Sequence, residues 1–311
     1  MKIGFFGTPE IARTCLDRLC QKHNVLFVVS SEDKPAGRKL RLRSCPAKEL
    51  ACCLSIPVYH PDNLKDPSFI ETLENYDADI FVVVAFGRII PREVFDIPPL
   101  KTINLHPSLL PLYRGAAPIE WALINGEKKT GITVQLINER LDAGDILLQR
   151  EIPVDVNMNA GDLYSIVKDI GPDLLDETIQ GLHDGSIVPR PQDENMATFC
   201  GKIDNNTLSI KWSRPAESIH NLVRGLSPGR GARTSFRGKI IKIYRTVLSG
   251  ECSEIPGLQP GEITVFRKKR LFAGTAGQPL EIISLQPETG RIMDALQFIN
   301  GQRIKPGDLF E

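Results

Sequence analysis

The sequence predicts an α/β protein in which a mostly parallel sheet, with helices on both faces, is followed by a small β-barrel domain. Up to about residue 190, short and continuous apolar runs alternate with helical stretches, as in parallel sheets that are buried on both faces. A polar, proline-rich segment then spans residues 188–195. Beyond it, short strands recur at intervals marked by turn residues, a spacing typical of a small barrel or sandwich.

The first part of the chain begins with a strand, a turn and a helix. Residues 2–6 form an apolar run, residues 7–9 interrupt it, and apolar residues then recur at helical spacing from Ile11 to Leu19. Further strands are predicted at 25–29, 79–85, 102–105 and 132–137, and helices at 66–75 and 118–125. In the second part we expect a helix at 216–224 and strands at 240–244, 261–266, 270–273 and 280–285.

The length of 311 residues suits two domains. We predict a first domain of residues 1–203, which includes a linker at about 188–203, and a second domain of residues 204–311. The net charge of zero hides an asymmetry, since residues 204–311 contain 16 Lys and Arg against 10 Asp and Glu. This basic balance fits a polyanionic partner such as nucleic acid, and it also fits a solvated surface.

Several classes of protein are disfavoured. The seven cysteines contain no C-x-x-C pair, which argues against a disulfide framework and against a thiolate zinc site. The longest apolar stretch, residues 80–86, is far shorter than the roughly 20 residues of a membrane span, and no signal peptide opens the chain. The first turn, Gly7-Thr8-Pro9-Glu10, lacks the G-x-G-x-x-G pattern of dinucleotide sites. We therefore expect a cytoplasmic protein without a dinucleotide cofactor.

Two polar segments come directly after predicted strands. Asn104 and His106 lie at the carboxyl end of the strand at 102–105, where open parallel sheets bind ligands, and alternation places both on one side of the chain. An amide beside an imidazole suits an oxyanion, although a histidine satisfied inside a turn is the simpler interpretation. Asp142 and Asp145 come after the strand at 132–137, where a carboxylate can orient the imidazole or merely stabilise a turn.

Taken together and in this order, these segments resemble the folate-dependent formyltransferases. The resemblance rests on residues 106–111 (HPSLLP), 114–119 (RGAAPI), 130–133 (TGIT) and 141–146 (LDAGDI). Residues 6–10, 33–38 and 210–217 are most similar to the members that formylate methionyl-tRNA, and the resemblance extends from Lys2 to about Phe310. It implies a Rossmann-like catalytic domain followed by an OB-like barrel that helps to hold tRNA.

The resemblance also implies an activity and its site. The formyl group of 10-formyltetrahydrofolate, a co-substrate, would pass to the amino group of methionine on initiator methionyl-tRNA, with no metal. Asn104, His106 and Asp142 correspond to the catalytic trio of the family. The folate-binding positions are Phe86, Gly87, Ile89, Ser108, Leu109, Leu110 and Pro111. The tRNA-binding positions are Lys34, Arg38, Lys39, Arg41 and Arg43, of which Arg38 is expected to matter most.

Other interpretations differ in the domain expected after the catalytic half. A glycinamide ribonucleotide formyltransferase is expected to end near residue 200, and a formyltetrahydrofolate hydrolase or dehydrogenase to carry a different partner domain. A non-catalytic RNA-binding protein with this fold has no reason to retain Asn104, His106 and Asp142. The basic second domain and the basic loop at 33–48 favour tRNA, and we expect a monomer.

Overall fold

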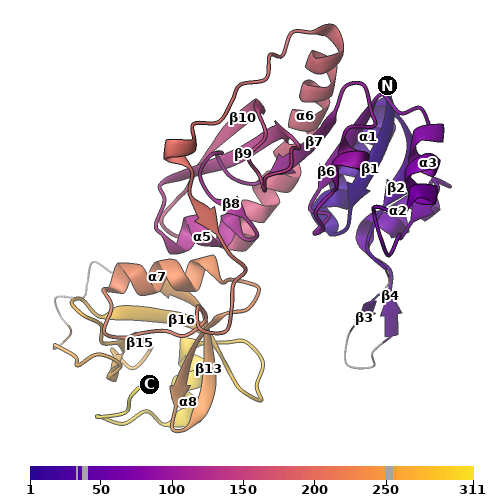
Figure 1. The fold of residues 1–311 in the computed structure, drawn as a ribbon. Coiled ribbons are helices and arrows are strands. Elements are labelled where there is room, and N and C mark those ends of the chain that lie inside the picture. Colours follow the sequence, from indigo (N-terminus) through magenta and orange to yellow (C-terminus); the bar gives the residue numbers. More distant parts are fainter. Residues whose placement is uncertain (33, 37–40, 249–254, 256) are drawn as a thin grey trace. The chain divides into compact units, whose positions relative to one another are not determined.

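The computed structural model describes the chain except for residues 33, 37–40, 249–254 and 256 (Figure 1). The described residues form two compact units. Unit 1 consists of Met1–Gly115, Thr130–Ile152 and Tyr164–Phe199, and unit 2 of Ala116–Lys129, Pro153–Leu163 and Cys200–Glu311. Unit 2 thus includes two stretches that precede residue 203, and the domain boundary at that residue stays a prediction.

Unit 1 is built on a sheet whose seven described strands follow the order β10-β9-β7-β6-β1-β2-β5. The strands are β1 (Lys2–Gly7), β2 (Asn24–Val29), β5 (Val58–Tyr59), β6 (Ile80–Val84), β7 (Thr102–His106), β9 (Lys129–Leu136) and β10 (Ile146–Pro153). From β5 to β7 neighbouring strands are parallel, whereas β9 is antiparallel to β7. Strands β1 and β6 are almost completely buried, which explains their continuous apolar sequence.

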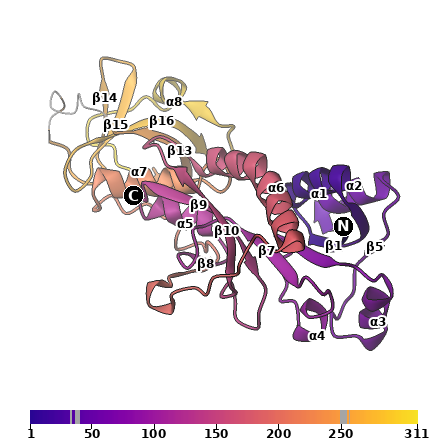
Figure 2. The same ribbon diagram turned by 90° about the horizontal axis from the view of Figure 1, so that it is seen from above.

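Helices cover both faces of this sheet (Figure 2). On one face lie α1 (Glu10–Lys22), α2 (Pro46–Cys53) and α6 (Ala160–Asp184), and on the other lie α3 (Pro67–Asn75) and α4 (Arg92–Phe95). An aromatic cluster fills the α3 side, where Phe6 and Phe81 of the sheet pack beside Phe69 of α3. On the α1 side, the buried carboxylate of Asp176 in α6 bonds to His23 at 2.9 Å. The helix α6, which contains Pro172, is not among the helices expected from the sequence.

Unit 2 contains an antiparallel sheet of six described strands in the order β12-β13-β16-β15-β14, with β17 paired to β16. The strands are β12 (Ala232–Phe236), β13 (Lys239–Val247), β14 (Ile263–Phe266), β15 (Arg270–Ala273), β16 (Leu280–Pro287) and β17 (Met293–Asp294). The helices of this unit include α5 (Pro118–Ile124), α7 (Ala216–Gly225) and α8 (Ala295–Gln302). Helices α5 and α7 pack closely at Gly225, where a Cβ atom would lie 2.7 Å from Ile124 Cγ1.

The C-terminal segment closes this sheet into a barrel. Phe310 N donates to Gly261 O (2.8 Å) just before β14, and Ser235 of β12 exchanges two backbone hydrogen bonds with Glu311 (2.8 and 3.0 Å). The segment therefore covers both edge strands, which would otherwise present unpaired backbone groups. The Phe310 ring stacks on Trp212 with centroids 5.6 Å apart and fixes the segment against the core.

The predicted fold class, an α/β Rossmann-like domain followed by a small barrel, is confirmed. Each strand and helix expected from the sequence is present, with bounds that differ by a few residues. Within the described ranges, no helix is both long enough and apolar enough to cross a lipid bilayer.

Candidate active site

The carboxyl end of β7 places polar side chains on one face of the sheet. Asn104 pairs with Gln135 of β9, and His106 pairs with Thr133. Because cross-strand partners share a face and alternate residues of a strand do as well, these four side chains lie on the same side. The face of the sheet that carries Asn104 and His106, as expected from the sequence, therefore also carries Gln135 and Thr133 of β9.

The imidazole of His106 is buried, and the structure distinguishes its two nitrogens. Nε2 lies 2.9 Å from the carbonyl oxygen of Tyr113. A carbonyl only accepts, so Nε2 carries a hydrogen and donates it. Nδ1 faces Asp142, with 3.6 Å between Nδ1 and Oδ2. This distance exceeds that of a direct hydrogen bond, so the two groups are neighbours without being tied together.

The carboxylate of Asp142 is held by two donors. Oδ2 accepts from the backbone N–H of Gly115 (2.9 Å), and Oδ1 accepts from Nε2 of Gln135 (3.1 Å). Asp142 adopts a left-handed backbone conformation with φ of 49°, which aspartate tolerates better than most residues. Next to it, Gly144 packs on β9 so closely that a Cβ atom would lie 1.8 Å from the carbonyl oxygen of Leu136.

Of the two carboxylates of the LDAGD turn, the structure brings Asp142 to His106. Asp145 instead fixes the turn to β9 through its backbone, since its carbonyl oxygen accepts from Leu136 N (2.9 Å). From the sequence alone, either carboxylate could orient the imidazole or merely stabilise the turn.

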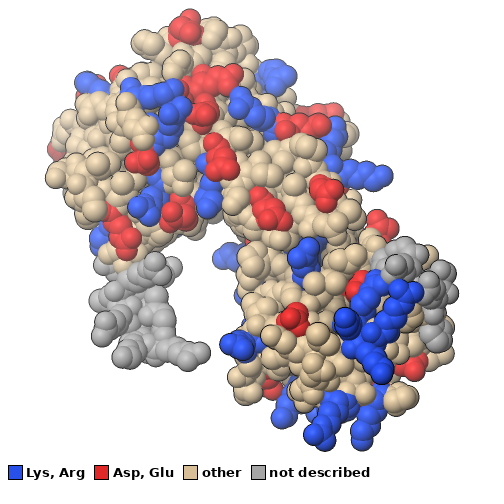
Figure 3. Space-filling model, turned by 180° about the vertical axis from the view of Figure 1, so that it is seen from behind, with Lys and Arg blue, Asp and Glu red and all other residues tan. Residues whose placement is uncertain are grey.

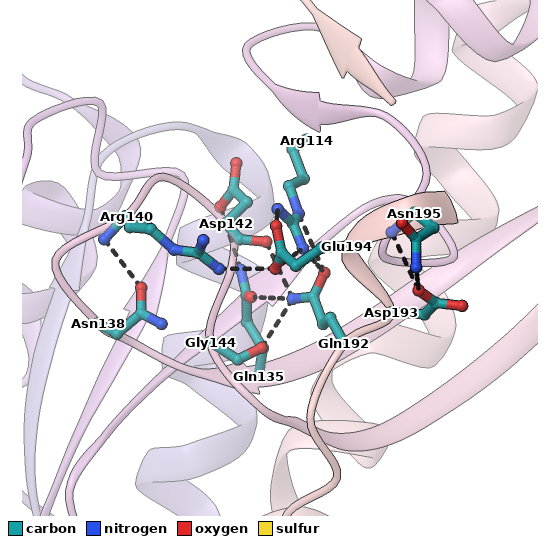
Figure 4. Close-up of polar contacts among 10 residues, drawn as sticks. All are labelled: Arg114, Gln135, Asn138, Arg140, Asp142, Gly144, Gln192, Asp193, Glu194 and Asn195. Carbon is teal, nitrogen blue, oxygen red and sulfur yellow. Dashed lines mark hydrogen bonds and ion pairs between the residues drawn. The ribbon is translucent and has the colours of Figure 1, made fainter. Parts of the chain in front are cut away.

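A buried polar network continues from Asp142 to Arg114 (Figure 4). The guanidinium of Arg114, in β8 (Arg114–Gly115), donates to Oε1 of Gln192 from Nε (3.1 Å) and Nη2 (2.8 Å). It also forms two hydrogen bonds with the carboxylate of Glu194 (3.1 and 3.0 Å). Arg140 bonds the same carboxylate at 2.6 Å. Hydrogen bonds from the two arginines lower the pKa of Glu194 to about 2, so this carboxylate is ionised at neutral pH.

Residues 108–111 form a loop that is anchored to β9 and β10. Thr133 Oγ1 donates to Ser108 O (2.7 Å) and accepts from Leu110 N (3.1 Å). Gln149 Nε2 donates to Leu110 O (2.9 Å), and Ser108 Oγ donates to Leu112 O (2.6 Å). The side chains of Ser108 and Leu110 are buried and their backbone groups are hydrogen-bonded within the protein, so Leu109 and Pro111, which are half-buried, are the residues that this loop can present to a ligand.

The other predicted folate-binding segment contains both core and exposed residues. Phe86 is buried and packs edge-to-face on Phe6 at 5.6 Å, so its side chain belongs to the core. Gly87 has φ of 80° with open space around its Cβ position, and Ile89 is 83% exposed. In the part of the chain that the structure describes, no residue accepts a hydrogen bond from the backbone N–H groups of Gly87, Arg88 and Ile89. An exposed apolar side chain beside free backbone donors fits a flat ring with polar edges.

The predicted tRNA-binding loop forms a two-stranded ribbon, β3 (Lys34–Ala36) and β4 (Arg41–Arg43). Its register pairs Lys34 with Arg43 and Ala36 with Arg41. Three of the five predicted tRNA-binding residues thus belong to one hairpin, whereas Arg38 and Lys39 lie outside the described residues.

Gln135, Arg114 and Gln192 were not identified as site residues from the sequence. Gln135 carries a recognisable signal, because it is a polar residue within an apolar strand and is 2% exposed. Gln192 carries none, since it lies in a polar segment predicted as a linker and is nevertheless 9% exposed. Among the residues described, no cluster of three His, Cys, Asp or Glu side chains could hold a metal ion.

Comparisons with known proteins identify the family of this chain. Residues 1–179 match the family model "Formyl transferase", and residues 202–303 match "Formyl transferase, C-terminal domain". The chain is 40% identical over 306 residues to a methionyl-tRNA formyltransferase from Clostridium novyi, with 98% of each chain covered. It is 38% identical over 308 residues to the corresponding protein from Clostridioides difficile, with 99% of each covered.

Solved structures show the same fold at lower identity. One of them is WlaRD, a sugar 3N-formyl transferase crystallised in the presence of dTDP and 5-N-formyl-THF. It aligns with a TM-score of 0.67 and 21% identity over 94% of this chain and 99% of its own. The two family models together span most of the sequence, and the chain therefore belongs to the formyl transferase family.

Proposed function

We propose that this chain transfers the formyl group of 10-formyltetrahydrofolate to the amino group of methionine on initiator methionyl-tRNA, for the initiation of translation. The observation that carries the proposal is the approach of His106 and Asp142 at the carboxyl end of β7, with 3.6 Å between Nδ1 and Oδ2. It occurs in a chain about 40% identical, over nearly its whole length, to methionyl-tRNA formyltransferases. A transferase of this class needs a donor for an oxyanion and an acceptor for a proton.

The folate co-substrate supplies a formyl group whose carbonyl oxygen gains negative charge as the methionyl amino group attacks. The side-chain amide of Asn104 has no hydrogen-bond partner among the described residues and shares the face of His106. The amide, together with protonated Nδ1 of His106, is suited to stabilise that oxygen. One such donor typically contributes about 10² to 10³ in rate.

Asp142 has two roles in this proposal. Its carboxylate stabilises the imidazolium form of His106 from 3.6 Å, and it accepts, through a water molecule, the proton that the attacking nitrogen loses. The bond between the formyl carbon and N10 of the folate then breaks, and N10 takes up that proton as tetrahydrofolate leaves. The Nε2–H bond to Tyr113 O fixes the ring so that Nδ1 is the nitrogen available to substrate and carboxylate. Both groups are thus oriented before substrate binds.

The folate would lie beside Gly87, Ile89 and the loop at 108–111. Ile89 offers an exposed apolar surface to the ring, and the backbone N–H groups of residues 87–89 and of Leu109 offer polar contacts. The side chains of Phe86, Ser108 and Leu110 support this surface from the core.

The tRNA would bind through cationic residues. The hairpin β3–β4 carries Lys34, Arg41 and Arg43, and unit 2 adds a net basic surface. Figure 3 shows Lys and Arg side chains gathered on one face of unit 2, whereas the visible face of unit 1 mixes both signs. Phosphate contacts of this kind supply affinity that falls with salt. We further propose that the protein works in the cytoplasm as a monomer.

One assay tests the function directly. Protein, 10-formyltetrahydrofolate and methionylated initiator tRNA are incubated, and formyl-methionyl-tRNA is measured, with an aminated dTDP-sugar as the alternative acceptor. We expect product on tRNA only. His106→Ala should lower kcat by at least about 10² with tRNA affinity unchanged, because the imidazole acts on charge that exists only in the transition state. The exposed His183, changed to Ala, serves as the matched control.

Two outcomes would refute these assignments. Formylation of the sugar and not of the tRNA would overturn the proposed acceptor. A His106→Ala variant that keeps more than about a tenth of the wild-type kcat would remove the imidazole from the mechanism.

A further inference from the structure

Gln192 links the predicted linker segment to the turn that carries Asp142. Its Nε2 lies 3.0 Å from Asp142 O, 2.7 Å from Gly144 O and 3.1 Å from Gln135 Oε1. All three of these atoms accept hydrogen bonds, and all belong to the strand and turn that surround the carboxylate. A side chain 50 residues away in sequence from Asp142 therefore provides the donor for this turn.

The amide of Gln192 can adopt only one orientation. Its Oε1 faces two N–H groups of Arg114, and a guanidinium has no acceptor. A flipped amide would place its NH₂ against those donors and its oxygen against three acceptors. The orientation of Gln192 is thus imposed by the buried Arg114, which the Glu194 carboxylate holds from the other side.

This orientation is passed on to the carboxylate (Figure 4). Because Gln192 donates to Oε1 of Gln135, the amide of Gln135 must present its NH₂ to Asp142 Oδ1, at 3.1 Å. The chain of donors runs from Arg114 through Gln192 and Gln135 and ends on Asp142. Buried networks of this kind fix a single arrangement when every member is satisfied.

We propose that Gln192 is a positioning residue that holds Asp142 toward His106 by donating to Gln135 and to the backbone of the Asp142–Gly144 turn. The inference rests on the proposed function for its kinetic consequence. Its structural consequence can be measured without substrate, because the Asp142 carboxylate accepts a hydrogen bond from the backbone N–H of Gly115 and a displaced carboxylate would weaken that bond.

Two variants remove the donor in different ways. Gln192→Met keeps the length of the side chain and loses both polar ends, whereas Gln192→Glu keeps an acceptor for Arg114 and replaces the NH₂ with a charged oxygen that cannot donate. We expect each to lower kcat by about 10- to 100-fold, as is typical for residues that orient a catalytic group, while both KM values stay within about twofold. Asn195→Ala, an exposed neighbour that bonds to Asp193, is the control and should behave like wild type.

A double variant separates positioning from a general structural role. Once Asp142→Asn has removed the carboxylate, adding Gln192→Met should lower single-turnover rates by less than about twofold, because both changes act through one group. Multiplicative losses in the double variant would overturn the proposal, and so would wild-type kcat in both single variants.

Hydrogen exchange provides a readout without substrate. The Gly115 amide should exchange faster in Gln192→Met and Gln192→Glu than in wild type and in Asn195→Ala. Unchanged protection of Gly115 would overturn the proposal even if activity fell. Absence of formyl-methionyl-tRNA with the wild-type protein would instead overturn the proposed function, and the exchange result would still decide the role of Gln192.

Discussion

Replacing Asp142 with Asn tests the proposed site most sharply, because the surrounding network cannot accept an amide. Both carboxylate oxygens receive hydrogen bonds, from Gly115 N at 2.9 Å and from Gln135 Nε2 at 3.1 Å. An asparagine has one acceptor, so in either rotamer its NH₂ faces one of these donors. Gln135 cannot turn to relieve the conflict, since Gln192 fixes its orientation.

The size of the effect can be worked out from these contacts. Leaving one buried donor unpaired costs about 1 to 3 kcal/mol, which should appear as a lower free energy of unfolding. Asp142→Asn also removes the negative charge that lies 3.6 Å from Nδ1 of His106. The imidazolium form of His106 then loses its stabilising partner in the transition state. We expect kcat to fall by about 10² to 10³, which corresponds to about 2.7 to 4 kcal/mol.

The measurement is the formylation rate of initiator methionyl-tRNA at saturating folate, together with the free energy of unfolding from urea titration. Asp145→Asn is the matched control, because it changes the other carboxylate of the same turn and leaves the backbone carbonyl of residue 145, which accepts from Leu136 N of β9, in place. A fully active Asp142→Asn beside an inactive Asp145→Asn would show that the wrong carboxylate has been assigned.

Phe310→Ala should destabilise unit 2 by about 3 to 5 kcal/mol, because it empties a site that is 2% exposed. Trp fluorescence during urea unfolding reports it, with the exposed Leu309→Ala as control, and equal effects would argue against barrel closure by this segment. Burial lowers the pKa of His220 in the folded protein. As the pH falls below about 6.5, the unfolded chain therefore binds a proton at this histidine more readily than the folded protein does, and the free energy of unfolding should decrease. His220→Gln should flatten the dependence of Tm on pH, and an unchanged curve would contradict this. Arg38→Ala should slow formylation of intact tRNA and reduce the salt slope of binding by about one, whereas wild-type kinetics would remove the loop from the interface.

The sequence by itself determined most of the architecture. Buried parallel strands need apolar residues on both faces, so residues 80–84 are identifiable without coordinates. Alternation within one strand likewise places Asn104 and His106 on the same face. The basic balance of residues 204–311 is a matter of composition. The assignment of the catalytic, folate and tRNA residues came from the family resemblance and stays a prediction.

Other features depended on contacts between distant segments, which local patterns do not encode. The long helix α6 is not among the elements expected from the sequence, and it continues through Pro172, a residue that locally disfavours a helix interior. It lies against the sheet, since a Cβ atom on Gly171 would be 3.0 Å from Leu105 Cδ2 of β7. Barrel closure depended on pairing the last residues with strands far earlier in the chain.

The arrangement of the site was likewise decided by tertiary structure. Asp142 rather than Asp145 faces His106 because Gly144 lets the turn approach β9, and a carbonyl at Tyr113 determines which imidazole nitrogen is available. Gln192 meets Arg114 across 78 residues of sequence. Its polar, proline-rich surroundings resemble a solvated linker, and only the folded chain reveals that its amide is buried, because hydrogen-bond partners for a buried polar group come from whichever segments the fold brings together.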